Sequence, residues 1–191
     1  MTPKAVSFHV VQSQILDLMR NDPWRMTALA SVRAFGLKDW AIGAGFVRAA
    51  VWDALSNYPT ATPIEDIDVV YFDRKLASEH HEKRIERRLS KLFPAPWSVK
   101  NQARMHRRNN NLPYHDTSDA LGHWLETPTC VAVRLDANDD LRLIAPHGID
   151  DLVRLRIRPT PAARRRMPVY RQRLRRKNWR KNWPALSVHM I

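Results

Sequence analysis

The sequence predicts an α/β fold, in which a small mixed sheet of about five strands is flanked by helices. The first observation is a set of short segments that are apolar or alternate apolar and polar residues, as strands do. The second is that segments with apolar residues three and four positions apart, the spacing of amphipathic helices, lie between them. Prolines and glycines separate the segments. The predicted strands span residues 40–42, 66–73, 97–103, 130–135 and 141–145.

The composition is that of a folded protein without disulfides. The chain has 191 residues, of which 44% are hydrophobic and 27% are charged, which excludes a disordered chain. Its one cysteine, Cys130, excludes an internal disulfide and a cysteine-based zinc site. No run of about 18 apolar residues and no signal-peptide pattern is present, so we expect a cytoplasmic protein with no membrane partner. The net charge of +13 favours polyanions or nucleotides as partners.

Two helices are predicted before the first strand. Residues 8–19 carry apolar side chains at helical spacing. Asp22 can cap the second helix, Pro23 suits its first position and Gly36 can end it. We expect residues 1–36 to pack on the core rather than to take part in chemistry.

A glycine-bearing turn follows the first predicted strand. It consists of Gly43, Ala44 and Gly45, and an apolar helix begins directly after it. Glycine lets the backbone turn sharply, and the N–H groups at a helix start attract phosphate. Arg48, on the first turn of that helix, adds a positive charge. The sequence therefore predicts a phosphate site here, although the third glycine of a Rossmann fingerprint is missing.

Two acids lie on the second predicted strand. Asp66 and Asp68 are two residues apart, so they share a face of the strand with Cα atoms roughly 6.5–7 Å apart. Like charges this close repel unless a cation lies between them. Oxygen ligands with no cysteine or histidine nearby favour Mg²⁺ or Mn²⁺. The alternative is that both acids merely face solvent at a sheet edge.

The middle of the chain predicts a helix, a strand and a long loop. Ser78 can cap the helix, whose charged side is expected to face water. The strand at residues 97–103 is followed by residues 104–116, which are rich in His, Arg and Asn and lack apolar periodicity. A loop of this length is usually functional or mobile. Thr117 or Ser118 is expected to cap the next helix.

A hairpin is predicted near the end of the core. Residues 130–135 and 141–145 alternate well, and the polar residues 136–140 between them form the turn. Asp150 and Asp151 follow at a helix start. We expect one of them to cap that helix, in preference to binding a metal.

The last part of the chain predicts a basic helical extension, residues 159–191, on a core of residues 37–158. Its aromatic residues could stack nucleic-acid bases while its cations bind the backbone. Alternatively, Val169, Leu174 and the tryptophans dock on the core and the arginines face water. Docking is the favoured interpretation. The cations are Arg164, Arg165, Arg166, Arg171, Arg173, Arg175, Arg176, Lys177, Arg180 and Lys181, interleaved with Tyr170, Trp179 and Trp183.

The glycine turn and the Asp-x-Asp strand together resemble the nucleotidyltransferase superfamily of polymerase-β-like enzymes. Four blocks in the same order are more closely similar to a bacterial family of nucleotidyltransferase-like proteins, over roughly residues 37–186. The blocks are residues 43–48 (GAGFVR), 66–73 (DIDVVYFD), 97–106 (WSVKNQARMH) and 145–152 (APHGIDDL).

This resemblance implies transfer of a nucleoside monophosphate, with AMP expected, from a nucleoside triphosphate to a hydroxyl acceptor with Mg²⁺ or Mn²⁺ as cofactor. Asp66 and Asp68 would hold the metal. The residues from Gly43 to Gly45 would cradle the β- and γ-phosphates, and Arg48 or Lys100 would neutralise the leaving pyrophosphate.

The chain departs from the superfamily pattern in two places. Ala44 stands where Ser or Gly is usual, and Asn101 stands where a third carboxylate is expected. Either another acid such as Asp73 or Glu126 completes the site, or catalysis is weak or absent. Two alternatives therefore remain: an inactive fold that binds a nucleotide or a partner, and an RNA-associated module that uses the basic extension.

Overall fold

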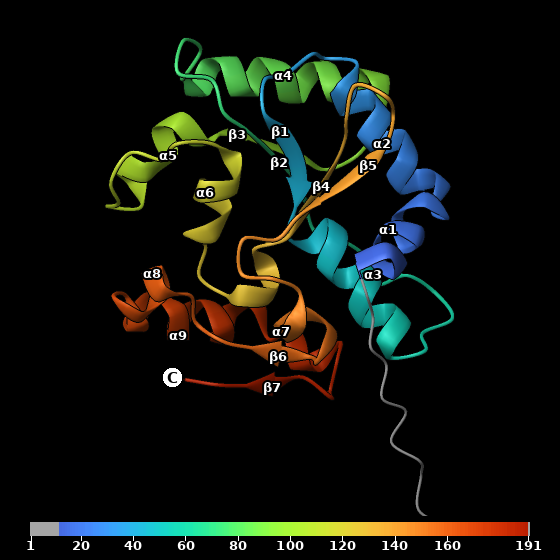
Figure 1. Cartoon of the computed structure of the whole chain (residues 1–191), viewed down its shortest axis with the longest axis vertical. Helices are drawn as coiled ribbons and strands as arrows, with labels where there is room; N and C mark the ends of the chain where they lie inside the picture. The colour runs from blue at the N-terminus through green and yellow to red at the C-terminus, as the bar shows by residue number, and fades with distance from the viewer. Residues whose placement is uncertain (1–11, 191) are drawn as a thin grey trace, which may run out of the picture.

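The computed structural model describes residues 12–190 and contains a mixed five-stranded sheet with the order β3-β2-β1-β4-β5 (Figure 1). β1 pairs in antiparallel fashion with β2 and β4, β4 pairs likewise with β5, and β2 and β3 are parallel. The predicted small mixed sheet is thus confirmed. The strands are β1 (Trp40–Gly43), β2 (Ile67–Tyr71), β3 (Trp97–Asn101), β4 (Ala132–Leu135) and β5 (Leu141–Ile144).

Four helices pack on one face of this sheet and enclose the main hydrophobic core. Ile67, Val69 and Tyr71 of β2 point into this core because they alternate along the strand. Asp22 caps the second helix as predicted, with its side chain 3.0 Å from the Arg25 N–H group. The part of the predicted first helix before residue 12 lies outside the described residues. The helices are α1 (Gln12–Arg20), α2 (Pro23–Arg33), α3 (Gly45–Leu55) and α4 (Glu79–Leu92).

The opposite face carries a smaller cluster, in which Ala41, Val70 and Ala132 meet Leu121 of α6 (Thr117–Gly122). Asp68 alternates with the core residues of β2, so it belongs to this second face. The Asp68 side chain therefore leaves the strand on the side opposite to Ile67, Val69 and Tyr71.

The connection after β3 differs from the prediction of a longer strand and a structureless loop. β3 ends at Asn101, whose side chain accepts a hydrogen bond of 3.0 Å from the Ala103 N–H group and so begins α5 (Gln102–Arg108). α5 shows no apolar stripe because only Gln102 on it is buried. Asp116, rather than Thr117 or Ser118, caps α6.

The hairpin of β4 and β5 is confirmed, but the capping prediction for the following acids is wrong. The helix α7 (Asp150–Val153) begins after Ile149, which offers no side-chain cap. Asp150 pairs with Arg154 at 2.8 Å, and Asp151 pairs with Arg158 at 2.8 Å. Both acids thus serve as partners for nearby arginines.

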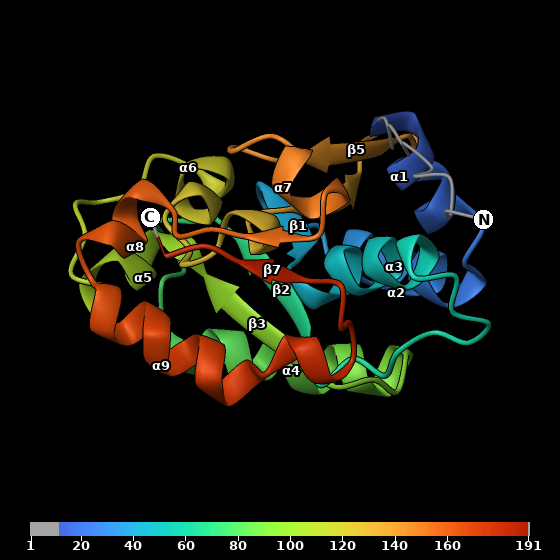
Figure 2. The same ribbon diagram turned by 90° about the horizontal axis from the view of Figure 1, so that it is seen from below.

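The basic extension docks on the core, as favoured from the sequence. It forms α8 (Pro161–Arg164), α9 (Met167–Lys177), a 3₁₀ turn (Trp179–Lys181) and β7 (Ser187–Val188), which pairs with β6 (Arg156–Ile157). Figure 2 shows α9 and β7 running across the underside of the molecule.

Two tryptophans anchor this extension on α3. The rings of Trp179 and Trp183 pack edge-on against Trp52, with ring centroids 6.0 and 5.1 Å away. Val169 takes no part in the docking and remains 46% exposed. Within residues 12–190, no helix has the length and apolar character needed to cross a membrane.

Candidate functional site

A small pocket lies where β1 ends and α3 begins. Its volume is about 80 Å³. It brings the glycine turn and Arg48 next to both acids of the Asp-x-Asp motif, which come from a later segment of the chain. Its lining residues are Ala44, Gly45, Arg48, Ala49, Pro63, Ile64, Glu65, Asp66, Asp68, Arg173, Lys177, Trp179, Asn182 and Trp183.

The glycine turn faces the acids directly. Gly43 is the cross-strand partner of Asp68, and a Cβ atom on Gly43 would approach the Val131 carbonyl oxygen to 3.1 Å. Ala44 has a φ of 50° and donates its N–H group to the same carbonyl at 3.0 Å. That N–H group is therefore already used. The first N–H groups of α3, on Gly45 and Phe46, have no acceptor within the helix and are the ones available to an anion.

The two acids have no partner within the described part of the chain. Asp66 is exposed just before β2, and Asp68 is half-buried on the strand. Neither forms a hydrogen bond or an ion pair with residues 12–190. Burial, followed by the charge of Asp66, raises the pKa of Asp68 to about 6. Two unpaired carboxylates with this repulsion form an arrangement that a cation stabilises.

Arg48 supplies a buried positive charge beside the acids. Its side chain is 8% exposed, and its Nε atom has no hydrogen-bond partner. The guanidinium lies over the rings of Trp52 and Trp179, at 5.1 and 4.6 Å from their centroids. Burial lowers the pKa of Arg48 to about 10 while the charge of Glu126 opposes this shift, so the group is protonated at neutral pH.

Two further cations come from α9, and the sequence interpretation did not place them here. Lys177 forms an ion pair of 2.5 Å with Glu65 beside the acids. Arg173 forms one of 2.9 Å with the fully buried Glu126. The sequence does contain a pattern that indicates the position of both cations. Tyr170, Arg173 and Lys177 follow the helical spacing that places them on the docked face of α9.

The remaining sequence candidates lie elsewhere. Lys100 is 3.7 Å from both Glu82 and Glu86 and does not line the pocket. Asn101 is in register with Tyr71, three positions beyond the partner of Asp68, so it lies on the other face of the sheet. Asp73 binds the Lys75 N–H group at 2.8 Å, beyond the far end of β2.

None of these residues supplies a third carboxylate to the pocket. Glu126 holds Arg173 and influences Arg48 instead of facing Asp66 and Asp68. In the part of the chain that the structure describes, no group of three or more His, Cys, Asp and Glu residues could hold a metal ion. Mg²⁺ is commonly bound by one or two carboxylates together with substrate phosphates and water. The two unpaired acids fit that mode.

Comparison with known proteins agrees with this geometry. A family model described as nucleotidyltransferase matches residues 30–188. A solved NMR structure that is described as revealing a CCA-adding enzyme head domain superposes with a TM-score of 0.84 at 34% identity, over 94% of this chain and 96% of the other. No curated protein matches the chain.

More distant matches show the fold alone. Two apo forms of a tRNA-processing enzyme superpose with a TM-score of 0.52 each, at 20% and 18% identity. The matches span 82% and 83% of this chain but 43% and 41% of the enzyme. Because the family model spans the glycine turn, the acid strand and the docked extension, the chain belongs to a nucleotidyltransferase family.

Proposed function

We propose that this protein transfers a nucleoside monophosphate, with AMP expected, from a nucleoside triphosphate to a hydroxyl acceptor with Mg²⁺ or Mn²⁺. The observation that carries this proposal is the pocket in which two unpaired acids face a helix start and the buried Arg48. Acids alone would suit any divalent cation, whereas acids beside a cluster of cations suit a metal-bound polyphosphate.

Asp66 and Asp68 would hold the metal ion through their carboxylate oxygens. When bound, such an ion neutralises charge on the attacking and leaving oxygens of the phosphoryl group. Asp68, half-buried and opposite Gly43, is fixed by the strand, while the exposed Asp66 can adjust to the incoming phosphate. One fixed and one mobile carboxylate thus suit a metal ion that enters the site together with its nucleotide.

The cations would bind the triphosphate and the leaving pyrophosphate. The N–H groups of Gly45 and Phe46 point out of the start of α3, where the helix dipole favours negative charge. Arg48 is held by two tryptophan rings and lacks a hydrogen-bond partner at Nε, so its donors are available to a phosphate oxygen. These groups need no rearrangement as charge develops, which is how a preorganised site stabilises a transition state.

Nucleotide entry requires the pocket to widen. Its volume of about 80 Å³ is well below the roughly 300–1,000 Å³ of typical ligand sites. The ion pair between Glu65 and Lys177 joins the loop before β2 to α9 at this point. We infer that this pair separates when a nucleotide binds, after which Lys177 is free to contact phosphate.

RNA is the acceptor class with the most support. Arg171, Arg175, Arg176 and Arg180 are exposed on the outer side of the docked extension. Exposed cations of this kind bind nucleic-acid backbones with a strong salt dependence. The similar solved structures are described as a CCA-adding enzyme head domain and a tRNA-processing enzyme. An RNA-associated role without catalysis uses the same surface and is the second candidate.

The substitution of Asn101 for the expected carboxylate supports the other alternative, a fold that binds nucleotide without turnover. Calorimetric titration of each nucleoside triphosphate, with and without Mg²⁺, separates these proposals when it is combined with an assay of label transfer from α-labelled nucleotides to RNA. An Asp66→Asn, Asp68→Asn double variant should lose metal-dependent binding. Asp140→Asn, in the exposed hairpin turn, is the matched control.

The outcomes differ for each candidate. Metal-dependent binding and label transfer that are lost only in the double variant support the enzyme. Binding without transfer to any acceptor favours the inactive fold. No binding by any triphosphate contradicts both, and salt-dependent RNA binding would then leave the RNA-associated module.

A further inference from the structure

A second and larger cavity, with a volume of about 450 Å³, lies at the opposite end of the sheet. It is formed by the segment that leads into β1, the end of β2, the turn after β2, and α4. Tyr71, in its wall, is three positions beyond Asp68, so the two side chains lie on opposite faces and about 10 Å apart along the strand. The cavity is therefore distinct from the nucleotide pocket.

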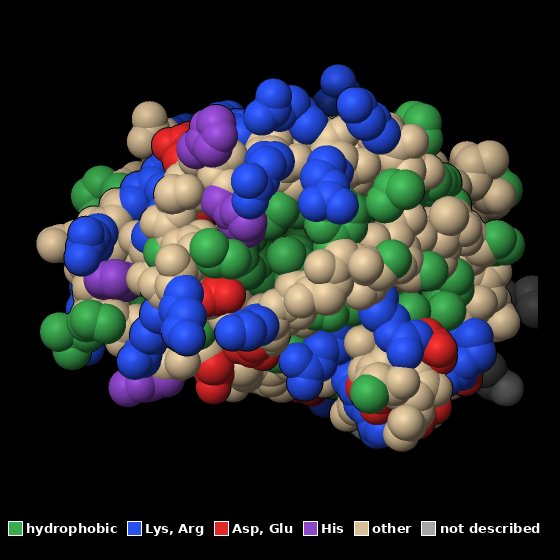
Figure 3. All heavy atoms as spheres, turned by 90° about the horizontal axis from the view of Figure 1, so that it is seen from above, with side chains coloured by type: hydrophobic (Ala, Val, Ile, Leu, Met, Phe, Trp, Pro, Cys, Tyr) green, Lys and Arg blue, Asp and Glu red, His purple; other side chains and the backbone are tan. Residues whose placement is uncertain are grey.

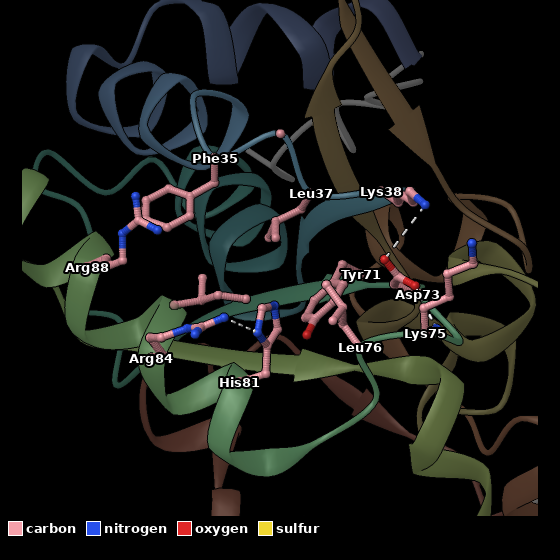
Figure 4. Close-up of a pocket in the computed structure, with 12 residues that line it drawn as sticks. Phe35, Leu37, Lys38, Tyr71, Asp73, Lys75, Leu76, His81, Arg84 and Arg88 are labelled. Atoms are coloured by element: carbon pink, nitrogen blue, oxygen red, sulfur yellow. Dashed lines mark hydrogen bonds and ion pairs between the residues drawn. The ribbon is translucent and has the colours of Figure 1, made fainter.

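The interior of this cavity is apolar. Phe35, Leu37, Leu76 and Ile85 contribute its hydrophobic side chains (Figure 4). Leu76 is 49% exposed. Figure 3 shows this face of the molecule with a hollow whose floor is hydrophobic. An apolar hollow of this volume falls within the range of small-molecule sites.

The margin of the cavity is strongly basic. Lys38, Lys75, Arg84 and Arg88 line it, and the acid among the lining residues is Asp73. Lys38 is 3.9 Å from Asp73. The two arginines on α4 have no acidic partner within residues 12–190. Arg84 is 2.8 Å from His81 Nδ1, and the Arg88 guanidinium stacks on the Phe35 ring at 4.8 Å from its centroid.

The wall also contains a buried donor without an acceptor. The Tyr71 side chain is 1% exposed, and its hydroxyl has no hydrogen-bond partner among the described residues. Burial, followed by the charge of Glu82, raises the pKa of Tyr71 to about 12, so the hydroxyl keeps its proton. In Figure 4 this hydroxyl is turned toward the His81 side of the cavity. A buried donor left unpaired is costly, and an acceptor atom of a ligand would satisfy it.

We propose that this cavity binds a small amphipathic anion, whose flat apolar body packs on Phe35 and Leu76 and whose carboxylate or phosphate group is held by Arg84 and Arg88. A neutral apolar ligand would leave the two arginines unpaired. A simple inorganic anion would leave the apolar floor in contact with water. Only a molecule with both parts satisfies both features of the cavity.

The test uses probes that differ in one part at a time. The full-length protein is titrated with 2-naphthoate, 2-naphthyl phosphate, the neutral 2-naphthalenemethanol and inorganic phosphate. Calorimetry gives the affinity, and amide shifts in NMR spectra give the location. We expect both naphthyl anions to bind more tightly than the neutral probe and inorganic phosphate. We also expect amide shifts around Leu37, Leu76 and Ile85. The stronger of the two anions identifies the preferred head group.

Matched variants separate this site from general attraction to a basic protein. Arg84→Gln with Arg88→Gln should weaken binding of the naphthyl anions at least about tenfold. Arg87→Gln with Lys91→Gln removes the same charge from the same helix, but at residues that do not line the cavity, and should change affinity less than twofold. All four side chains are exposed, so both double variants should keep the circular dichroism spectrum of the parent.

Three results would overturn the proposal: no binding of either naphthyl anion, equal binding of the neutral probe, or equal losses in the two double variants. The Asp66→Asn, Asp68→Asn variant should bind the naphthyl anions as the parent does. A result that contradicts the anion site can thus be distinguished from a result that contradicts the nucleotide site.

Discussion

The partial burial of Asp68, together with its position beside Asp66, predicts that replacing Asp68 stabilises the protein in a pH-dependent way. The pKa of Asp68 is raised from 3.8 to about 6 because the side chain is partly buried and lies next to Asp66. In the unfolded chain this pKa returns to its ordinary value. Folding therefore favours the protonated acid, and the folded state is destabilised once the pH is high enough for Asp68 to ionise.

The magnitude follows from the size of the pKa change. At about 1.4 kcal/mol per pH unit, a rise from 3.8 to about 6 corresponds to about 3 kcal/mol. Asp68 is only half-buried and solvent screens part of the repulsion, so we expect about 1–3 kcal/mol. The penalty is absent below about pH 4, grows between about pH 4 and 6, and is constant above that range.

The assay is urea unfolding of the parent and of Asp68→Asn without metal ions, at intervals from pH 3.5 to 8. The variant should gain free energy of unfolding relative to the parent as the pH rises, and the gain should level off above about pH 6. Asp66→Asn should show a smaller gain of the same sign, because the charge of Asp66 is the second cause of the shift. A difference that does not vary with pH would refute the reasoning.

Three further predictions concern the pocket and the segment that docks beside it. Trp179→Ala removes a 7% exposed ring that packs on Trp52 and covers Arg48, so urea unfolding should show a loss of about 3–5 kcal/mol; a loss below about 1 kcal/mol would contradict the docking role. Ala44→Gly relieves a φ of 50°, a conformation that costs about 1–3 kcal/mol in a non-glycine residue. Because glycine also gives the unfolded chain more conformational entropy, the net rise in the free energy of unfolding in urea should be about 1 kcal/mol. A decrease would disprove this prediction. Glu65→Gln breaks the pair with Lys177 at an exposed carboxylate, so stability should stay within about 0.5 kcal/mol while calorimetry shows tighter nucleotide binding; unchanged affinity would mean that this pair does not restrict entry.

Much of the fold was predictable because it depends on neighbouring residues. The alternation around Val69, the polar turn between β4 and β5, and the cap at Asp22 are local features with direct physical causes. The errors were local as well. Asn101 is the last residue of β3 as well as the cap of α5, so the strand ends there and does not continue to residue 103 as predicted.

The acid pair, the glycine turn and the basic extension can each be recognised in the sequence as separate features. That they meet depends on tertiary packing, because Lys177 contacts Glu65 across 112 positions of the chain. Long-range contacts of this kind depend on how the tryptophans of the extension pack on α3, which no local spacing specifies. The second cavity also depends on tertiary packing. Its apolar floor and its arginines come from segments whose sequence patterns predict only a loop and a solvated helix, and only packing brings these segments together.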